Sequence, residues 1–252
     1  MAARDEMLGF ADDLLDVSAY ADFCPNGLQV PGAAEVTTVI SGVSANRELI
    51  ERAIAAGAEL LIVHHGLFWD KGTRALSEAM AARLRVALGA DLSIAGYHLP
   101  LDAHPEIGNN ALLCAGLGLR ASGRFAEAGG QPIGVVGTHD EGLEVEDLAA
   151  GVAELTGREP LVLGDGPGTI HRVGIVSGGG APFLGEAAGL GLDALLSGEP
   201  SEQAMADSRE AGLHFLAAGH HASERLGISA LGDLLAERFG VSHEFVEVPN
   251  PV

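Results

Sequence analysis

The chain has 252 residues, 47% of them hydrophobic and 19% charged, which is enough apolar sequence for a sizeable core and excludes disorder as its main state. Acidic residues outnumber basic residues by 35 to 14, so the formal net charge is −21. A field of this sign repels phosphate backbones and anionic lipid headgroups, which argues against nucleic-acid partners and membrane surfaces.

The N-terminal segment MAARDEMLGFADDLL places apolar residues at helical spacing, which predicts a helix. It carries acidic residues rather than the basic region and apolar stretch of a signal peptide, and no segment approaches the roughly 20 apolar residues that a membrane helix needs. We therefore expect a cytoplasmic protein. The following FCPNGLQVPG contains Pro and Gly breakers, which predict a loop.

The next part of the chain alternates apolar, β-branched runs with helical patterns. The predicted strands are VTTVISGVS, ELLIVHHG and DLSIAGYH, and the predicted helices are ANRELIERAIAAGA and about residues 75–88. Strands separated by helices indicate an α/β fold with a largely parallel or mixed sheet flanked by helices.

The same order of patterns returns later in the chain. HRVGIVSGGG, LDALLSGE and LHFLAAGHH are predicted strands, separated by the helical PFLGEAAGLG and SEQAMADSREAG. Ser-Gly, Ser-Glu-x-Met and Ala-Gly-x-His pieces keep their order in both halves, which indicates an internal duplication of about residues 36–102 and 170–224. The alternative is that any two βαβ units look alike.

These patterns predict two similar α/β lobes. Residues 1–122 form the first lobe, and residues 123–215 form the second lobe with a glycine-rich insertion that contains PIGVVG, EVEDLAAGVAELTG and LVLGDGPG. Residues 216–252, with the helical GISALGDLLAERFG and the short strand HEFVEV, return to the first lobe and complete a metal site.

Histidines and carboxylates gather where predicted strands end. His64 and His65 follow LLIV, Asp102 comes four residues after His98, and Glu224 comes four residues after His220. The carboxyl ends of parallel strands are where ligands and catalytic groups gather. We therefore expect these side chains at one edge.

This combination predicts a pair of divalent ions. Adjacent histidines at a strand end point to different sides and can serve two metals, while carboxylates can bridge or cap them. The proposed ligands are His64, His65, Asp102, His220 and Glu224. Imidazole and carboxylate ligands suit zinc, iron, manganese, nickel or cobalt, and without nearby thiolates they do not favour a closed structural zinc. Either His98 or His221 could shuttle protons or orient a ligand carboxylate, and His98 is the candidate proton shuttle of a hydrolase.

Other readings of the chemistry are weaker. His139, His171, His214 and His243 are expected to be structural, and His104 is a loop residue that either supports a metal ligand or has no role. There is no GxSxG motif for a serine nucleophile. Cys24 has no neighbouring base, and Cys114 lies far away with no CxxC, so neither a thiolate nucleophile nor a disulfide framework is favoured. SGGG is weak evidence for anion binding and better evidence for a tight turn.

With these residues identified, nearly the whole chain resembles the Nif-three-like dinuclear-metal-centre family, whose bacterial members are often labelled GTP cyclohydrolase I type 2 homologues. The resemblance rests on PNGLQV, SGVS, IVHHGLFW, YHLPLDAHPEIGNN, PIGVVG, IVSGGG, LLSGE and GHHASE. It implies the same five metal ligands, with His98 beside the site. It also implies a homohexameric toroid, built as a trimer of dimers, whose metal pairs face an internal cavity.

Two functions remain open at this point. One is a metal-dependent hydrolase for a small, nucleotide-like substrate, in which a metal-bound water attacks; in the GTP version it attacks C8 of guanine and the ring opens. The other is a non-catalytic, metal-binding or metal-sensing ring that serves as an adaptor for other proteins.

Overall fold

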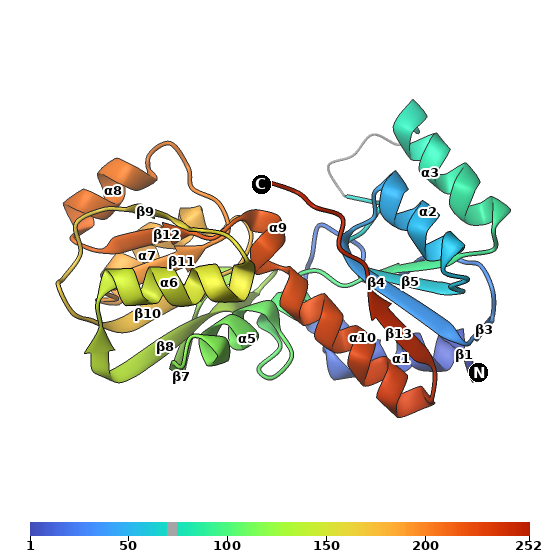
Figure 1. Ribbon diagram of the computed structural model, residues 1–252, viewed down its shortest axis with the longest axis horizontal. Helices are drawn as coiled ribbons and strands as arrows, with labels where there is room; N and C mark the ends of the chain where they lie inside the picture. Colours follow the sequence, from blue (N-terminus) through green and yellow to red (C-terminus); the bar gives the residue numbers. More distant parts are fainter. Residues whose placement is uncertain (70–74) are drawn as a thin grey trace. The chain divides into compact units, whose positions relative to one another are not determined.

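In the computed structural model, which describes residues 1–69 and 75–252, the chain forms two compact units (Figure 1). Unit 1 contains Met1–Leu101 and Gly227–Pro249, and unit 2 contains Asp102–Leu226 and Asn250–Val252. These boundaries differ from the expected 122/123 and 215/216. Strand β7, which begins at Arg120, pairs along its length with β8 of unit 2, so residues 120–122 belong to unit 2 and not to the first lobe.

Unit 1 is built on a five-stranded sheet with the order β13-β4-β5-β6-β2. The strands of unit 1 are β1 (Ala2–Ala3), β2 (Gly27–Val30), β3 (Glu35–Val36), β4 (Thr38–Ser44), β5 (Leu60–His65), β6 (Ser93–Gly96) and β13 (Ser242–Phe245). Its helices are α1 (Arg4–Leu14), η1 (Val17–Ala19), α2 (Arg47–Ala55) and α3 (Glu78–Gly89), together with most of α10 (Arg225–Phe239). Helix α4 (Leu99–Ala103) spans the boundary between the units.

The strands β4, β5 and β6 are parallel, as the sequence predicts. Their side chains are buried almost without interruption, because helices cover both faces of such a sheet. Helices α2 and α3 lie on one face and α1 and α10 on the other (Figure 1). Helices α2 and α3 are each capped at the N-terminus by a side chain. Asn46 accepts a hydrogen bond from the Leu49 N–H, and Ser77 accepts one from the Met80 N–H.

Strand β2 corrects the sequence prediction of a loop. Gly27–Val30 pairs antiparallel with β6, and Gly27 lies opposite Gly96. A four-residue edge strand between prolines carries no local period of its own. Its conformation is decided by pairing with a strand far away in the sequence.

Unit 2 is built on a six-stranded sheet with the order β7-β8-β10-β11-β12-β9. Its strands are β7 (Arg120–Ala128), β8 (Gln131–Leu143), β9 (Leu161–Leu163), β10 (Ile170–Val176), β11 (Ala194–Ser197) and β12 (His214–Ala217). Its helices are α5 (Asn109–Gly116), α6 (Val145–Thr156), η2 (Ala181–Phe183), α7 (Leu184–Gly189), α8 (Ala204–Ala211) and α9 (His220–Ser223).

The strands β10, β11 and β12 are parallel and repeat the arrangement of β4, β5 and β6. In each unit an antiparallel strand borders the last of the three, β2 beside β6 and β9 beside β12. The predicted glycine-rich insertion supplies β8, which pairs antiparallel with β10. The expected α/β class with sheets flanked by helices is confirmed.

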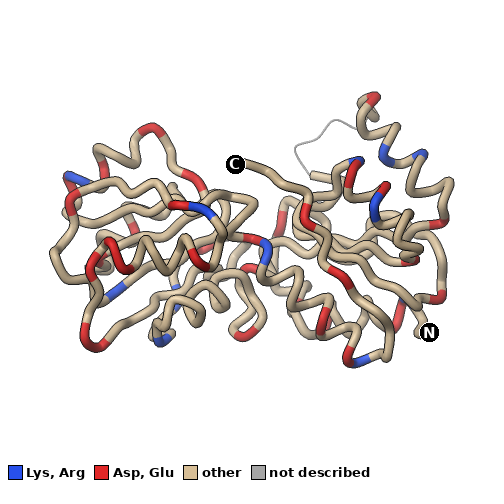
Figure 2. The backbone as a smooth tube through the Cα atoms, viewed as in Figure 1, with Lys and Arg blue, Asp and Glu red and all other residues tan. Residues whose placement is uncertain are grey.

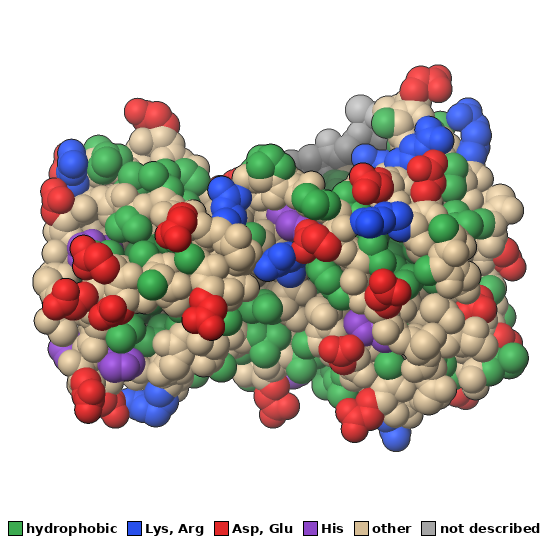
Figure 3. All heavy atoms as spheres, in the orientation of Figure 1, with side chains coloured by type: hydrophobic (Ala, Val, Ile, Leu, Met, Phe, Trp, Pro, Cys, Tyr) green, Lys and Arg blue, Asp and Glu red, His purple; other side chains and the backbone are tan. Residues whose placement is uncertain are grey.

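Acidic side chains are spread over each unit and outnumber the basic side chains, which also occur on both units (Figures 2 and 3). Within the described part of the chain, none of the helices has both the length and the apolar character that a membrane crossing requires.

Candidate metal centre

Three histidines of unit 1 come together at the carboxyl ends of β5 and β6. His64 and His65 are the last residues of β5, and His98 lies two residues after the end of β6. Each offers one ring nitrogen, and the three atoms lie within 4.8 Å of one another. His64 is fully buried and His98 almost so. Unit 1 alone therefore assembles three imidazoles in the way that the strand-end argument predicts.

The hydrogen-bond partners of two of these rings define their tautomers. The His64 Nδ1 atom lies 2.9 Å from the Tyr97 carbonyl oxygen, which can only accept, so Nδ1 carries the proton. The His98 Nδ1 atom lies 2.9 Å from Oδ1 of Asp22 and likewise donates. In the neutral rings the lone pair is thus on Nε2 of both residues, which is the state that a metal ligand or a general base requires.

Asp22 is a partner of this histidine cluster that the sequence argument missed. Its side chain is almost fully buried, and besides His98 it accepts hydrogen bonds from the backbone N–H groups of Cys24 and Leu99 and from the Asn26 amide. Burial raises the pKa of Asp22, but the hydrogen bond and charge of His98 outweigh it and lower the pKa to about 2. A lone aspartate in a predicted loop gives no local signal of such a role.

Gln29 of strand β2 contacts the segment that follows the paired histidines. The side-chain oxygen Oε1 of Gln29 accepts a hydrogen bond of 2.7 Å from the Leu67 N–H, and its side-chain amide Nε2 donates to the Pro25 carbonyl oxygen. A β-carbon at Gly66 would collide with the Gln29 side chain, which explains the glycine after the two histidines. The PNGLQV motif is therefore the support of this histidine cluster.

In unit 2, Asp102 lies in α4 and is fixed by two neutral donors. The Asn109 amide and the Ser177 hydroxyl donate to its Oδ1 atom over 2.8 and 3.0 Å. Asp102 and Glu224 are both buried, and each offers a carboxylate oxygen within 4.8 Å of the other. Two buried carboxylates at this separation repel each other, so the arrangement favours a bound cation or proton.

His220 supplies positive charge beside these carboxylates. Its Nε2 atom lies 3.2 Å from Glu224 Oε1, and its Nδ1 atom lies 3.3 Å from Glu199 Oε2. Burial disfavours the charged ring, but Glu224 and Glu199 outweigh it and raise the pKa of His220 to about 9. Glu199 belongs to the LLSGE motif, yet its distance in sequence from His220 concealed this contact.

The glycines of SGGG form a turn against the carboxylates. The N–H groups of Gly178 and Gly180 donate to the hydroxyls of Ser223 and Ser197. Because these N–H groups already donate to side chains of the protein, SGGG is better described as a tight turn than as an anion-binding loop. Gly178 has a φ of +60°, and a β-carbon there would collide with Glu224 Oε1.

Other histidines have structural partners within their own units. The His243 ring bonds Asp233 and Ser41, His214 bonds the Pro167 carbonyl, and His104 accepts from the N–H groups that follow it. The expectation that His214 and His243 are structural agrees with these bonds.

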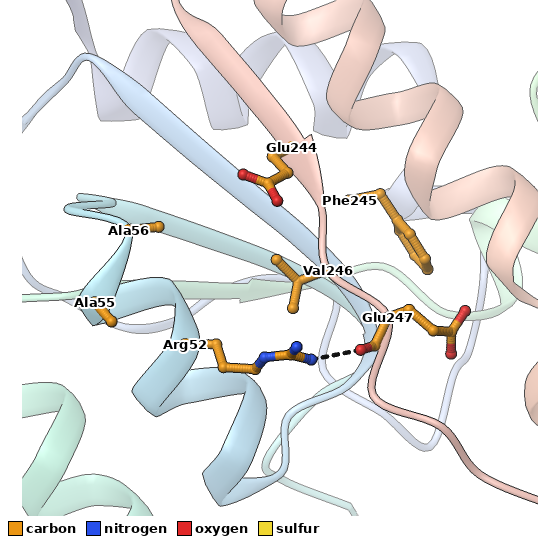
Figure 4. Close-up of a pocket in the computed structure, with 7 residues that line it drawn as sticks. All are labelled: Arg52, Ala55, Ala56, Glu244, Phe245, Val246 and Glu247. Carbon is orange, nitrogen blue, oxygen red and sulfur yellow. Dashed lines mark hydrogen bonds between the residues drawn. The ribbon is translucent and has the colours of Figure 1, made fainter.

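One surface pocket of unit 1 lies between α2 and the segment after β13, with a volume of about 460 Å³ (Figure 4). Arg52 lines it and donates to the Glu247 carbonyl oxygen over 2.6 Å. Its lining contains none of the three clustered histidines. We therefore do not assign it to the metal chemistry.

The donor groups suit divalent metal ions. They are imidazole nitrogens in unit 1 and, in unit 2, buried carboxylates beside His220, and two of the imidazoles have Nε2 as the acceptor nitrogen. The fold and these side chains together define an α/β protein with groups in both units that could bind metal ions.

The chain belongs to the Duf34/NIF3 (NGG1p interacting factor 3) family, whose model matches residues 2–251. A relative from Pseudomonas aeruginosa is 42% identical over 241 residues, covering 96% of this chain and 95% of the relative. One from Escherichia coli K12 is 42% identical over 247 residues, covering 98% of each. Both are named "GTP cyclohydrolase 1 type 2 homolog".

Solved structures agree with this assignment. The protein ybgI, described as of unknown function, has a TM-score of 0.94 and 40% identity over the full length of both chains. TTHA1606 from Thermus thermophilus has a TM-score of 0.90 and 32% identity, also over both full lengths. The expected family is thereby confirmed.

Proposed function

We propose that this protein is a dinuclear metal-dependent hydrolase that opens a ring of a nucleotide-like substrate, as the name shared by its relatives suggests. The observation that carries the proposal is the donor set: His64 and His65 in unit 1, and Asp102, His220 and Glu224 in unit 2. We assign these five residues as ligands of two divalent ions. A cytoplasmic homohexamer, built as a trimer of dimers, is part of the proposal.

A bound divalent ion supplies Lewis acidity, which lets water act as a nucleophile near neutral pH. The chain's own contribution is a proton acceptor in a fixed orientation. Because the Asp22 carboxylate holds the proton on His98 Nδ1, His98 Nε2 is the atom that accepts a proton during the reaction. The Tyr97 carbonyl orients the neighbouring His64 ring in the same way.

Metal content tests the ligand assignment. Purified protein should bind close to two ions per chain, and Asp102→Ala should lower that number. His65→Ala and Glu224→Gln should each lower metal affinity in calorimetry, and the double variant should lose less than the sum if they serve one cluster. His171→Ala and Glu210→Gln, both at exposed positions, are the matched controls. Full occupancy in Asp102→Ala, or independent losses in the double variant, would contradict the shared centre.

A substrate screen tests the catalytic part. Metal-loaded protein is assayed against GTP and a panel of phosphoesters and amides, with and without a chelator. Turnover that disappears with the chelator and returns with metal supports the hydrolase. Two bound ions with no turnover of any substrate would favour the metal-binding adaptor instead.

A further inference from the structure

Two large aromatic side chains of unit 1 are exposed beside the clustered histidines. Phe23 is 46% exposed and Trp69 is 36% exposed. Their ring centroids lie 5.7 Å apart, and we call them the aromatic pair. His98 is next to both, with centroid distances of 5.1 Å to Phe23 and 5.4 Å to Trp69. The His65 ring lies 5.8 Å from Trp69.

The aromatic pair is held in place by its neighbours in the chain. Phe23 lies between Asp22, whose carboxylate bonds His98, and Cys24, which is fully buried. Trp69 lies two residues after Leu67, which is buried and donates its N–H to the Gln29 side chain. Hydrogen bonds and burial thus order the backbone beside Phe23 and two residues before Trp69, while both rings are exposed.

Exposed aromatic rings of this kind favour a ligand with a flat, apolar face. Only 4% of the residues are aromatic, and Trp69 is the sole tryptophan in the chain. Exposing such large rings to water forgoes the free energy of burying them, which a ligand that stacks on them recovers. Stacking on Phe or Trp needs a π-face and no charge, so it suits a chain with a net charge of −21.

We propose that the aromatic pair binds the planar heteroaromatic ring of the substrate by stacking. This inference rests on the proposed function, because it places the ring that reacts beside His98. The ligand class is a neutral, flat nitrogen heterocycle of the size of a purine. Phe23 and Trp69 are then specificity-determining residues, and neither belongs to the proposed metal ligands.

The fluorescence of Trp69 tests this directly, since no other tryptophan contributes to the emission. Chelator-treated protein is titrated with guanosine and, separately, with ribose. Guanosine should change the emission in a saturable way and ribose should not. Using a nucleoside without metal removes contributions from phosphate and from ions.

Variants locate the binding to the pair. Phe23→Leu should weaken guanosine binding at least about fivefold, given the size of base stacking on aromatic side chains. Phe183→Leu, in η2 of unit 2, is the matched control and should leave the affinity unchanged. Trp69→Leu removes the fluorophore, so its affinity is measured by equilibrium dialysis and should fall similarly. Circular dichroism checks that each variant is folded.

Three results would overturn the inference. Guanosine could fail to saturate the signal, or Phe23→Leu could bind it as the wild type does. A third is that either variant lowers the oligomeric mass in light scattering while guanosine affinity is unchanged, which would make the pair a contact between copies.

Saturable guanosine binding without turnover in the metal-loaded protein would support the pair and contradict the hydrolase. Turnover with a KM that Phe23→Leu leaves unchanged would support the hydrolase and contradict stacking on the aromatic pair.

Discussion

At Gly178, the absence of a β-carbon leaves the space that Glu224 of unit 2 occupies. It has a φ of +60°, and the space where its β-carbon would lie is occupied by Glu224 and His220. An L-residue there is strained by its backbone and also displaces two proposed ligands. Gly130 has a φ of +82° but no atom near its β-carbon position, so it carries the backbone strain alone.

This contrast gives a matched pair of substitutions. Gly130→Ala should cost about 1 kcal/mol of unfolding free energy from backbone strain alone. Gly178→Ala should cost about 1–3 kcal/mol more because of overpacking, and it should also reduce bound metal. Urea unfolding in the presence of chelator, with metal analysis, measures both. Equal losses of stability with normal metal content would show that Gly178 is only a turn residue.

Asp22 is the second residue whose role emerges from its contacts. Its buried carboxylate accepts hydrogen bonds from His98, Leu99, Cys24 and Asn26. Asn at this position places an amide N–H₂ among donors, so some of these bonds are lost. We expect Asp22→Asn to cost about 2–3 kcal/mol of stability.

The same substitution should remove the preference of the neutral His98 ring for a proton on Nδ1. In wild-type protein without metal, ¹⁵N NMR of His98 should show the tautomer protonated on Nδ1 when the ring is neutral, and Asp22→Asn should show a mixture. Asp140→Asn, which alters an exposed carboxylate paired with Arg120, is the control. An unchanged His98 spectrum would remove Asp22 as its positioning residue.

At the scale of elements, Glu59 joins the starts of two neighbouring strands. It precedes β5, and its carboxylate accepts hydrogen bonds from the N–H groups of Thr37 and Thr38, at the start of β4, and from the Thr37 hydroxyl. Burial raises the pKa of Glu59, but these hydrogen bonds outweigh it and the pKa is lowered. The ionised form therefore stabilises the β4–β5 pair.

Glu59→Gln should lower stability by about 1 kcal/mol at neutral pH. Because the pKa of the folded state is lowered, this stabilisation is present above the ordinary glutamate pKa and is lost as pH falls through the folded value. The gap between wild type and variant should shrink below about pH 4. Unfolding curves at several pH values measure it, with Glu48→Gln on α2 as the control. A gap independent of pH would assign the effect to packing.

At the scale of the whole molecule, charge opposes assembly. Each chain carries a formal charge of −21, so copies in a ring repel one another unless salt screens them. The proposed hexamer must overcome this repulsion through its interfaces.

Light scattering at high salt should therefore give a mass near six times 25.7 kDa. At low salt the mass should fall towards that of smaller building blocks, because screening weakens. A monomer at every salt concentration would contradict the proposed assembly. A salt-independent hexamer would show that the acidic surfaces lie away from the interfaces.

The sequence by itself determined the α/β pattern and the positions of the clustered imidazoles. Buried parallel strands read as continuous apolar runs, and His64, His65 and His98 follow such runs directly, so local periodicity was sufficient to place them. The motifs also identified the family, which the comparisons confirmed over residues 2–251.

The tertiary structure alone decided how those imidazoles are held. Asp22 reaches His98 across 76 residues, Gln29 reaches Leu67 across 38, and Glu199 meets His220 from a different strand end. Strand β2 likewise exists because β6 pairs with it. Such contacts leave no period in the sequence, since each depends on one side chain meeting a distant backbone or ring. Hydrogen-bond partners are fixed by where the folded backbone brings them, and only the packed units specify that.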